Sequence, residues 1–246
     1  MTGLEGKVAL VTGASKGIGA EIARSLGEQG VMVGVNYLSD QAGAEAVVRH
    51  ILGLGRRCIA VHGDVGDPQA VTTMVKKVEE ELGPIAILVN NAGVARHTPF
   101  IEMEEEEWNW MFQVHVYGTC RCIWRVLPGM IARKGGAIVN IISELALVGE
   151  TGLSHYVAAK CAVIGLTKSL AREVGPLGIR VNAVAPGPVD TQMLTDAERS
   201  EEFIRALPLR RLGLPQDIAP TVSLLCSDEG SWFTGQVISP NGGAVI

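Results

Sequence analysis

The chain has 246 residues, of which 47% are hydrophobic and 19% charged, so it is long enough to bury one full core. Its net charge of -5 and its dispersed lysines and arginines exclude the basic surface that nucleic-acid partners require. No apolar run reaches the roughly 20 residues of a membrane span and the N-terminus lacks a signal-peptide layout, so we expect a cytoplasmic protein without membrane contact.

A glycine-rich turn comes first in chain order. The apolar run 7–11 predicts a strand, and 20–29 has the apolar spacing of a helix. Between them stands Thr12-Gly13-Ala14-Ser15-Lys16-Gly17-Ile18-Gly19. We expect Gly13 to allow a tight turn, Gly17 to admit a pyrophosphate and Gly19 to let helix and strand pack closely. The spacing differs from the commoner Gly-x-Gly-x-x-Gly fingerprint, and a purely structural turn is the alternative.

The end of the second apolar run, 31–37, bears on the choice of cofactor. Dinucleotide-binding folds place an acidic residue for the ribose 2′-hydroxyl of NAD roughly 20 residues after the glycines. Here Asn36 and Tyr37 stand at that point, and Lys16 can meet a 2′-phosphate. The sequence therefore favours NADP(H), with NAD(H) as the alternative. In that alternative Lys16 is a solvated turn residue, and Asp40 or a water recognises the ribose.

Strand and helix continue to alternate through the middle of the chain. The patterns predict helices at 42–53 and 68–82 and strands at 57–62 and 85–89. The last strand runs into Asn90-Asn91-Ala92-Gly93. There we expect the backbone to lie against a nucleotide while the asparagines brace adjacent strands, although the same four residues are compatible with an ordinary turn.

One long helix is predicted over residues 104–133. Its acidic start, 102–107, suits the first turn of a helix, so we expect no metal site there. Gly118 and Pro128 lie inside the helix and predict close packing or a bend.

Three side chains with a shared chemistry follow the apolar run 137–142, which predicts a buried strand. Ser143 stands where this strand ends, and Tyr156 and Lys160 lie four residues apart on one face of a predicted helix. A tyrosine has an ordinary pKa of about 10, so acid/base work near neutral pH requires a perturbed environment, for which an adjacent ammonium is one source. A serine hydroxyl facing the phenol can donate to a carbonyl oxygen as charge develops. The sequence thus predicts a site that polarises a carbonyl, although Tyr-x-x-x-Lys alone is common on helices.

The last third of the chain completes the alternation. We expect strands at 179–185 and 236–239, a helix at 215–227, and a rigid loop over 186–191. Residues 192–212 are too long for an ordinary connection and are predicted to form a substrate loop or lid. The whole chain, 1–246, is therefore predicted to be one α/β domain with a parallel sheet covered on both faces.

Taken in order, these motifs resemble the short-chain dehydrogenase/reductase family, and the resemblance covers essentially the whole chain. The residues that carry it are Thr12-Gly13-x-x-x-Gly17-Ile18-Gly19, Asp64-Val65, Asn90-Asn91-Ala92-Gly93, Ser143, Tyr156-x-x-x-Lys160 and Pro186-Gly187. The resemblance implies a Rossmann-type doubly wound sheet of seven strands, in the order 3-2-1-4-5-6-7, with the cofactor across the carboxyl ends of the strands.

The resemblance also implies residue roles. Tyr156 would donate the proton in reduction, Ser143 would orient the carbonyl, and Lys160 would hold the nicotinamide ribose and lower the pKa of the tyrosine. The implied cofactor contacts are Gly13, Ser15, Lys16, Gly17, Ile18, Gly19, Asn36, Asp64, Val65, Asn91, Ala92, Gly93, Tyr156, Lys160, Pro186, Gly187, Val189 and Thr191.

One position departs from the family pattern. Three residues before Gly118, the family usually has an asparagine that anchors a water in the proton relay to the lysine, and this chain has His115. Imidazole also binds water, so His115 is expected in the relay, the alternative being a packed core histidine.

Within the family, the segments 212–219 and 234–243 resemble those of 3-oxoacyl-acyl-carrier-protein reductases. This implies reduction of a 3-oxoacyl thioester, carried on acyl carrier protein or coenzyme A, and a homotetramer or dimer with an interface on the long fourth and fifth helices. Arg133 with Lys134 is a candidate patch for the acidic carrier protein, whereas Leu177 stands where these reductases often have a basic residue.

Two other functions remain open from the sequence. An alcohol or sugar dehydrogenase of the same family would use the same groups in the oxidative direction. A nucleotide-binding regulatory protein without chemistry is the alternative of another class, and the altered His115 keeps it open.

Overall fold

Short runs of valine, isoleucine and alanine, buried on both faces, form the strands of a parallel sheet in the computed structural model, which describes residues 1–246. The strands are β1 (Val8–Val11), β2 (Met32–Tyr37), β3 (Cys58–His62), β4 (Ile85–Asn90), β5 (Gly136–Ile141), β6 (Ile179–Val184) and β7 (Val237–Ile238). They pair in the order β3-β2-β1-β4-β5-β6-β7. The predicted seven-stranded order is confirmed.

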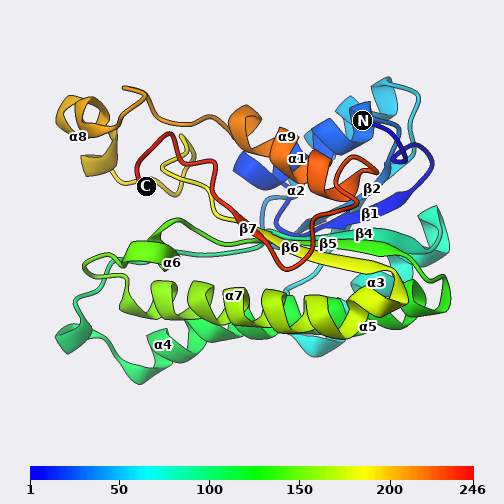
Figure 1. Ribbon diagram of the computed structural model, residues 1–246, viewed down its shortest axis with the longest axis horizontal. Helices are drawn as coiled ribbons and strands as arrows, with labels where there is room; N and C mark the ends of the chain where they lie inside the picture. Colours follow the sequence, from blue (N-terminus) through cyan, green and yellow to red (C-terminus); the bar gives the residue numbers. More distant parts are fainter.

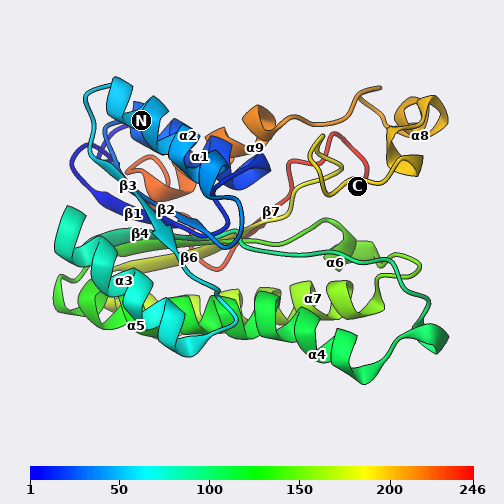
Figure 2. The same cartoon turned by 180° about the vertical axis from the view of Figure 1, so that it is seen from behind.

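Helices cover both faces of this sheet (Figures 1 and 2). The α-helices are α1 (Gly17–Glu28), α2 (Gln41–Gly53), α3 (Pro68–Leu82), α4 (Glu105–Phe112), α5 (Gly118–Ala132), α6 (Leu145–Val148), α7 (Ser154–Val174), α8 (Glu201–Ala206) and α9 (Pro215–Cys226). Short 3-10 turns, η1 (Phe100–Glu102), η3 (Gly175–Leu177) and η4 (Ala197–Arg199), add to them. One face packs on α1, α2 and α9 and the other on α3, α5 and α7, which gives two apolar cores of 26 and 21 buried residues. The similar size of the cores explains why the strands are apolar on both sides.

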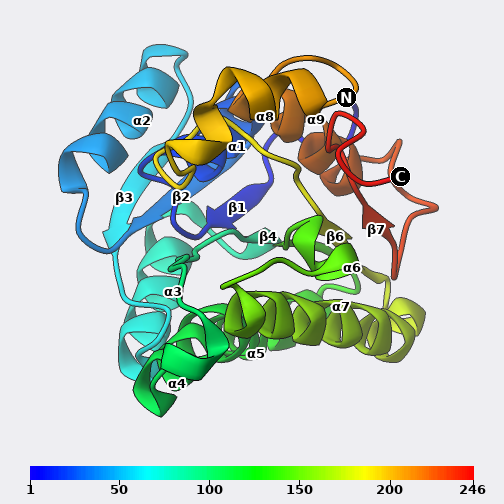
Figure 3. The same ribbon diagram turned by 90° about the vertical axis from the view of Figure 1, so that its left-hand side faces the viewer.

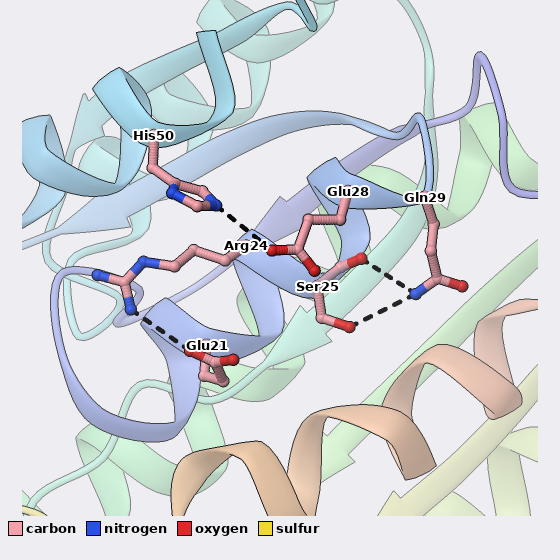
Figure 4. Close-up of polar contacts among 6 residues, drawn as sticks. All are labelled: Glu21, Arg24, Ser25, Glu28, Gln29 and His50. Atoms are coloured by element: carbon pink, nitrogen blue, oxygen red, sulfur yellow. Dashed lines mark hydrogen bonds and ion pairs between the residues drawn. The ribbon is translucent and has the colours of Figure 1, made fainter. Parts of the chain in front are cut away.

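Polar contacts hold the helices of the first layer together (Figure 4). Glu28 of α1 and His50 of α2 approach to 3.4 Å, across the gap between the two helices. On the other side of α1, the Gln29 amide donates to the Ser25 carbonyl at 3.0 Å and to Ser223 Oγ of α9 at 2.9 Å. Polar contacts between helices therefore stabilise this layer in addition to its apolar core.

The long helix predicted over 104–133 is present as consecutive helical segments from Glu105 to Ala132. Between α4 and α5, residues Gln113–Tyr117 form a π-helical segment, η2. The close packing expected at Gly118 is confirmed, because a Cβ there would lie 2.8 Å from Val65 Cγ2. π-Helical segments are frequent at functional sites, and this one carries His115.

Two short helices mark one end of the sheet. The helix α6 follows β5, and α8 belongs to the long connection after β6; both face the viewer in Figure 3. The helix α6 was not predicted, whereas the segment 192–212 does contain structure of its own, η4 and α8. No helix combines the length and the apolar character needed to cross a membrane.

Candidate active site

Neutral hydrogen bonds hold the glycine turn after β1. The Gly13 amide donates to Asn36 Oδ1 at 3.1 Å, and Asn91 Nδ2 donates to the carbonyls of Thr12 and Gly13 at 2.9 and 3.0 Å. Gly13 has a φ of +61°, and a Cβ there would lie 2.8 Å from Ala92 Cα. A Cβ on Gly19 would overlap Asn91 Nδ2 and the Gly13 carbonyl. The turn therefore requires glycine at both positions.

The asparagines at the end of β4 brace neighbouring strands, as predicted. Asn90 Nδ2 donates to Asn140 Oδ1 at 2.9 Å, which ties β4 to β5, and Asn140 in turn donates to Thr167 Oγ1 at 2.9 Å. The backbone amides of Asn91 and Ala92 both donate to Thr12 Oγ1. The turn after β1 and the loop after β4 thus form one hydrogen-bonded unit.

The start of α1 suits a phosphate. Lys16, the residue before the helix, makes no side-chain cap, so the amides of the first turn retain their donor capacity. Gly17 has a φ of +56° and presents backbone rather than a side chain, and the partly exposed Ser15 lies beside it. Ile18 packs against the core and orients this turn. These features fit the pyrophosphate of a dinucleotide.

The other cofactor candidates from the first half of the chain divide into structural and accessible groups. Asn36 is buried, and its amide donates to the carbonyls of Val61 and Gly63, so it supports the turn from β2. Asp40 accepts from the Gly43 amide at 2.9 Å as the N-cap of α2. Asp64 accepts from the Gly66 amide at 2.7 Å and stays partly accessible after β3.

The loop after β6 lies against the glycine turn. Thr191 Cγ2 is 3.3 Å from the Cβ position of Gly17, and Lys16 Nζ donates to Gln192 Oε1 at 2.9 Å. Arg199 pairs with Asp190 and donates to the Thr191 carbonyl at 2.5 Å. The start of the segment 192–212 is therefore fixed beside the turn.

The preceding residues of that loop join it to the end of the chain. Gly187 is close-packed on Asn241, and the Gly187 amide donates to the Pro240 carbonyl at 3.2 Å. Val189 is buried and bridges to Gly213. A hollow of about 250 Å³ lies on this side of the loop, and its lining includes Gly187, Val189 and Asn241 but not Ser143, Tyr156 or Lys160.

Ser143, Tyr156 and Lys160 converge at the carboxyl end of β5. All three are buried, with exposed fractions of 7, 7 and 5%. Lys160 Nζ donates to the Ile141 carbonyl at 2.9 Å and lies 5.5 Å from the centre of the Tyr156 ring. The fold thus brings the strand-end hydroxyl, the phenol and the ammonium together.

Burial sets the proton affinities of this group. It raises the pKa of Tyr156 to about 12, an effect that the adjacent Ser143 hydroxyl partly offsets and the charge of Glu144 increases, and it lowers the pKa of Lys160 to about 7. Burial is the main cause of this shift at Tyr156, and the expected lowering of the tyrosine pKa by Lys160 stays a prediction. The phenol is therefore held in its neutral, proton-donating form.

His115 lies directly behind the phenol. Its ring meets that of Tyr156 edge to face, with centres 5.3 Å apart, and a Cβ on Gly93 would lie 2.7 Å from its Cε1. Nε2 lies 2.8 Å from the Val94 carbonyl, to which it donates in one tautomer, and 3.2 Å from the Val94 amide, from which it accepts in the other; buried Nδ1 has no partner. Burial holds the pKa of His115 well below its usual value, so the ring is neutral.

Glu144 is a functional candidate that sequence reasoning missed. It is 7% exposed and accepts a hydrogen bond from Ser143 Oγ at 3.1 Å. Burial raises its pKa to about 7, and the charge of Glu198 adds to that shift. The available signal was one carboxylate in an otherwise apolar stretch, Ser-Glu-Leu-Ala-Leu-Val, directly after a predicted strand.

The Arg133–Lys134 patch lies at the opposite end of the sheet. Both residues precede β5, whereas Ser143 follows it, which separates them by roughly 20 Å at 3.3 Å per strand residue. Arg133 also donates to the Ile85 carbonyl at 2.6 Å, at the start of β4. The patch is therefore far from the reacting groups.

Comparison with known proteins gives consistent matches over the full length. Residues 13–245 match the family model described as enoyl-(acyl carrier protein) reductase. The chain is 45% identical over 240 residues to the 3-oxoacyl-[acyl-carrier-protein] reductase FabG of Staphylococcus aureus (strain Mu50), covering 96% of this chain and 97% of that protein. The reductase FabG of Vibrio cholerae is 40% identical over 98% of each chain. A crystal structure of a blue fluorescent protein from a metagenomic library, in complex with NADPH, superposes with a TM-score of 0.94 at 38% identity over 99% of each chain.

Proposed function

The chain belongs to the short-chain dehydrogenase/reductase family, and we propose that it reduces the 3-oxo group of an acyl thioester with NADPH. The observation that carries this proposal is the convergence of Ser143, Tyr156 and Lys160 beside a glycine turn that fits a dinucleotide. The relatives named 3-oxoacyl-[acyl-carrier-protein] reductase support the thioester as substrate.

The carbonyl oxygen is expected to lie between the hydroxyl of Ser143 and the phenol of Tyr156. The hydride is supplied by the reduced nicotinamide when NADPH is bound. As negative charge develops on the oxygen, Ser143 stabilises it with a hydrogen bond and Tyr156 transfers its proton. The buried phenol is neutral before the step, which is the form that a proton donor requires. The same groups run the reverse step for an alcohol dehydrogenase, the alternative within the family.

Lys160 and His115 act on the tyrosine rather than on the substrate. After Tyr156 gives up its proton, the nearby Lys160 ammonium stabilises the phenolate and returns a proton to it. The unpartnered Nδ1 of His115 suits a water that would extend this relay. We expect His115→Asn to shift the pH profile of reduction; an unchanged rate and profile would contradict the relay role.

Two observations support NADP(H) over NAD(H). Lys16 is exposed in the glycine turn, and no carboxylate follows β2 until Asp40, which is engaged as the cap of α2. The related structure with NADPH supports the same preference. The cofactor would also contact Asp64, Val65, Asn91, Ala92, Gly93, Pro186, Gly187, Val189 and Thr191.

The segment 192–212 is proposed to cover the substrate. Its attachment to Lys16 through Gln192 and to Asp190 through Arg199 fixes its start at the cofactor end.

A homotetramer is proposed on the exposed aromatic face of α4, η2 and α5, where Trp110, Tyr117 and Trp124 are 38, 47 and 62% exposed. Sedimentation velocity tests the assembly, and a monomer at micromolar concentration would contradict it.

Initial rates with acetoacetyl thioesters test the proposed reaction. NADPH and NADH are compared as reductants, and oxidation of simple alcohols and sugars is measured with NADP and NAD. We expect thioester reduction with NADPH preferred. Activity confined to alcohol oxidation would contradict the substrate assignment while leaving the role of Tyr156 in place, and cofactor binding without turnover would favour a regulatory protein.

A further inference from the structure

Glu144 places a carboxyl group directly against a hydroxyl that the proposed reaction uses. Ser143 and Glu144 are equally buried, at 7% exposure. The backbone amide of Glu144 donates to the Pro186 carbonyl at 3.1 Å, so the residue is fixed between β5 and the loop after β6. Its carboxyl group is therefore held at the site rather than extended into solvent.

The hydrogen bonds of Ser143 leave no donor for a substrate. A serine hydroxyl has one hydrogen. Ser143 Oγ accepts from the Leu145 amide at 3.2 Å and donates its hydrogen to Glu144 Oε2 at 3.1 Å. While that bond persists, Ser143 cannot donate to a carbonyl oxygen. The protonation state of Glu144 decides whether it persists, because only a protonated carboxyl group can donate to Oγ in return.

We propose that Glu144 is a positioning residue that sets the direction of the Ser143 hydroxyl hydrogen: protonated Glu144 donates to Ser143 Oγ and frees that hydrogen for the substrate, whereas ionised Glu144 captures it. Ionised Glu144 also places negative charge beside the oxygen that becomes an alkoxide. Both effects oppose reduction. The inference rests on the proposed carbonyl reduction.

The groups around Glu144 allow both its protonated and its ionised form to be populated near neutral pH. Glu198, from the segment after β6, raises the pKa of Glu144 together with burial. Tyr156 and Lys160 face the same space from α7, and the pKa of Lys160 is also about 7. A wild-type pH profile therefore contains contributions from Lys160 as well as Glu144, and only a comparison of variants separates them.

The kinetic test compares the pH dependence of kcat/KM for NADPH-dependent acetoacetyl-thioester reduction in wild type, Glu144→Gln and Glu173→Gln. The glutamine in Glu144→Gln keeps the size of the side chain and cannot ionise, whereas Glu173 is an exposed carboxylate at the far end of α7. Above the titration point, ionisation of Glu144 lowers kcat/KM by up to about tenfold per pH unit. We expect Glu144→Gln to lose that contribution and Glu173→Gln to retain it. Superimposable profiles of wild type and Glu144→Gln, both binding NADPH, overturn the proposal.

A second readout does not depend on turnover. Infrared difference spectra are recorded from about pH 5 to about pH 9, roughly two units on either side of 7. They follow the band of the Glu144 carboxyl group, which is identified because it is absent in Glu144→Gln. Because Ser143 donates to the ionised form, Ser143→Ala is expected to move this titration to higher pH. An unmoved titration overturns the inference. Absence of thioester reduction by wild type would instead contradict the proposed function, and the infrared result would still decide the Ser143–Glu144 coupling.

Discussion

The glycine turn after β1 and the reacting groups after β5 lie at the same carboxyl edge of the sheet, but they are built from different groups. Amides, a threonine hydroxyl and backbone carbonyls hold the turn, and their hydrogen bonds are mutually satisfied. At the end of β5, Glu144, Tyr156 and Lys160 are ionisable groups whose pKa values burial displaces.

The difference indicates two kinds of dependence on the surrounding fold. The turn depends on close approach between backbone segments, so a single added Cβ atom should disrupt its structure. The reacting groups depend on desolvation, which costs stability in the free protein and supplies reactivity in return. Perturbing one region should therefore change binding and folding, while perturbing the other should change chemistry and pH dependence.

The largest effect is expected from Gly13→Ala. The added Cβ meets Ala92 Cα at 2.8 Å in a left-handed backbone conformation, so we predict a loss of about 1–3 kcal/mol of stability and loss of NADPH binding. Gly53→Ala is the matched control, because nothing lies within 4 Å of its Cβ position. Urea unfolding and NADPH titration measure both effects. Wild-type affinity and stability in Gly13→Ala would remove the close-approach explanation.

Lys160→Met is expected to have the opposite effect on stability. The pKa of Lys160 is about 7 in the folded chain and about 10.4 when unfolded. Between these values the unfolded state binds more protons, so wild-type stability includes a contribution that rises with pH across that window. The variant should lose this rise and gain roughly 2 kcal/mol near pH 7, while losing turnover.

Unfolding at several pH values tests that prediction. Lys168→Met, an exposed lysine on the same helix, provides the control and should leave the pH dependence unchanged. A Lys160→Met variant that is less stable than wild type at pH 7 would show that the buried ammonium does not lower the free energy of unfolding.

Lys16→Ala should give the smallest effect, confined to the cofactor. Loss of one exposed ammonium beside a 2′-phosphate should weaken NADPH binding by about tenfold, equivalent to 1.4 kcal/mol, and leave NADH binding unchanged. Lys76→Ala on α3 is the control. Equal losses for both cofactors would assign Lys16 to the turn itself, through its bond to Gln192.

Local sequence patterns predicted the turn better than they predicted the reacting groups. Gly13, Gly19 and Asn91 have roles set by spacing and backbone approach, which are readable along the chain. The convergence of Ser143, Tyr156 and Lys160 was also predictable, because a strand end and a helix face fix their places. The effect of burial on the pKa of Tyr156 could not be predicted along the chain, because desolvation depends on everything packed around the group.

Other differences have equally specific causes. The π-helical segment at Gln113–Tyr117 lies within a long helix whose apolar spacing is regular, so periodicity alone did not reveal it. The short α6 follows Glu144 in an apolar stretch without a helix-length pattern. Arg133 with Lys134 was proposed on charge alone as a patch for the acidic carrier protein, and the direction of the parallel strand places it at the other end of β5 from Ser143.

Tyr156→Phe, which removes only the hydroxyl group, tests whether Tyr156 is the proton donor. NADPH affinity and thioester reduction are measured on the same preparation. We predict an unchanged NADPH dissociation constant and a loss of kcat of about 10²–10⁴-fold, because the phenol is the proton donor and the glycine turn is intact. Retained turnover in Tyr156→Phe would contradict the assignment of the reaction to this site.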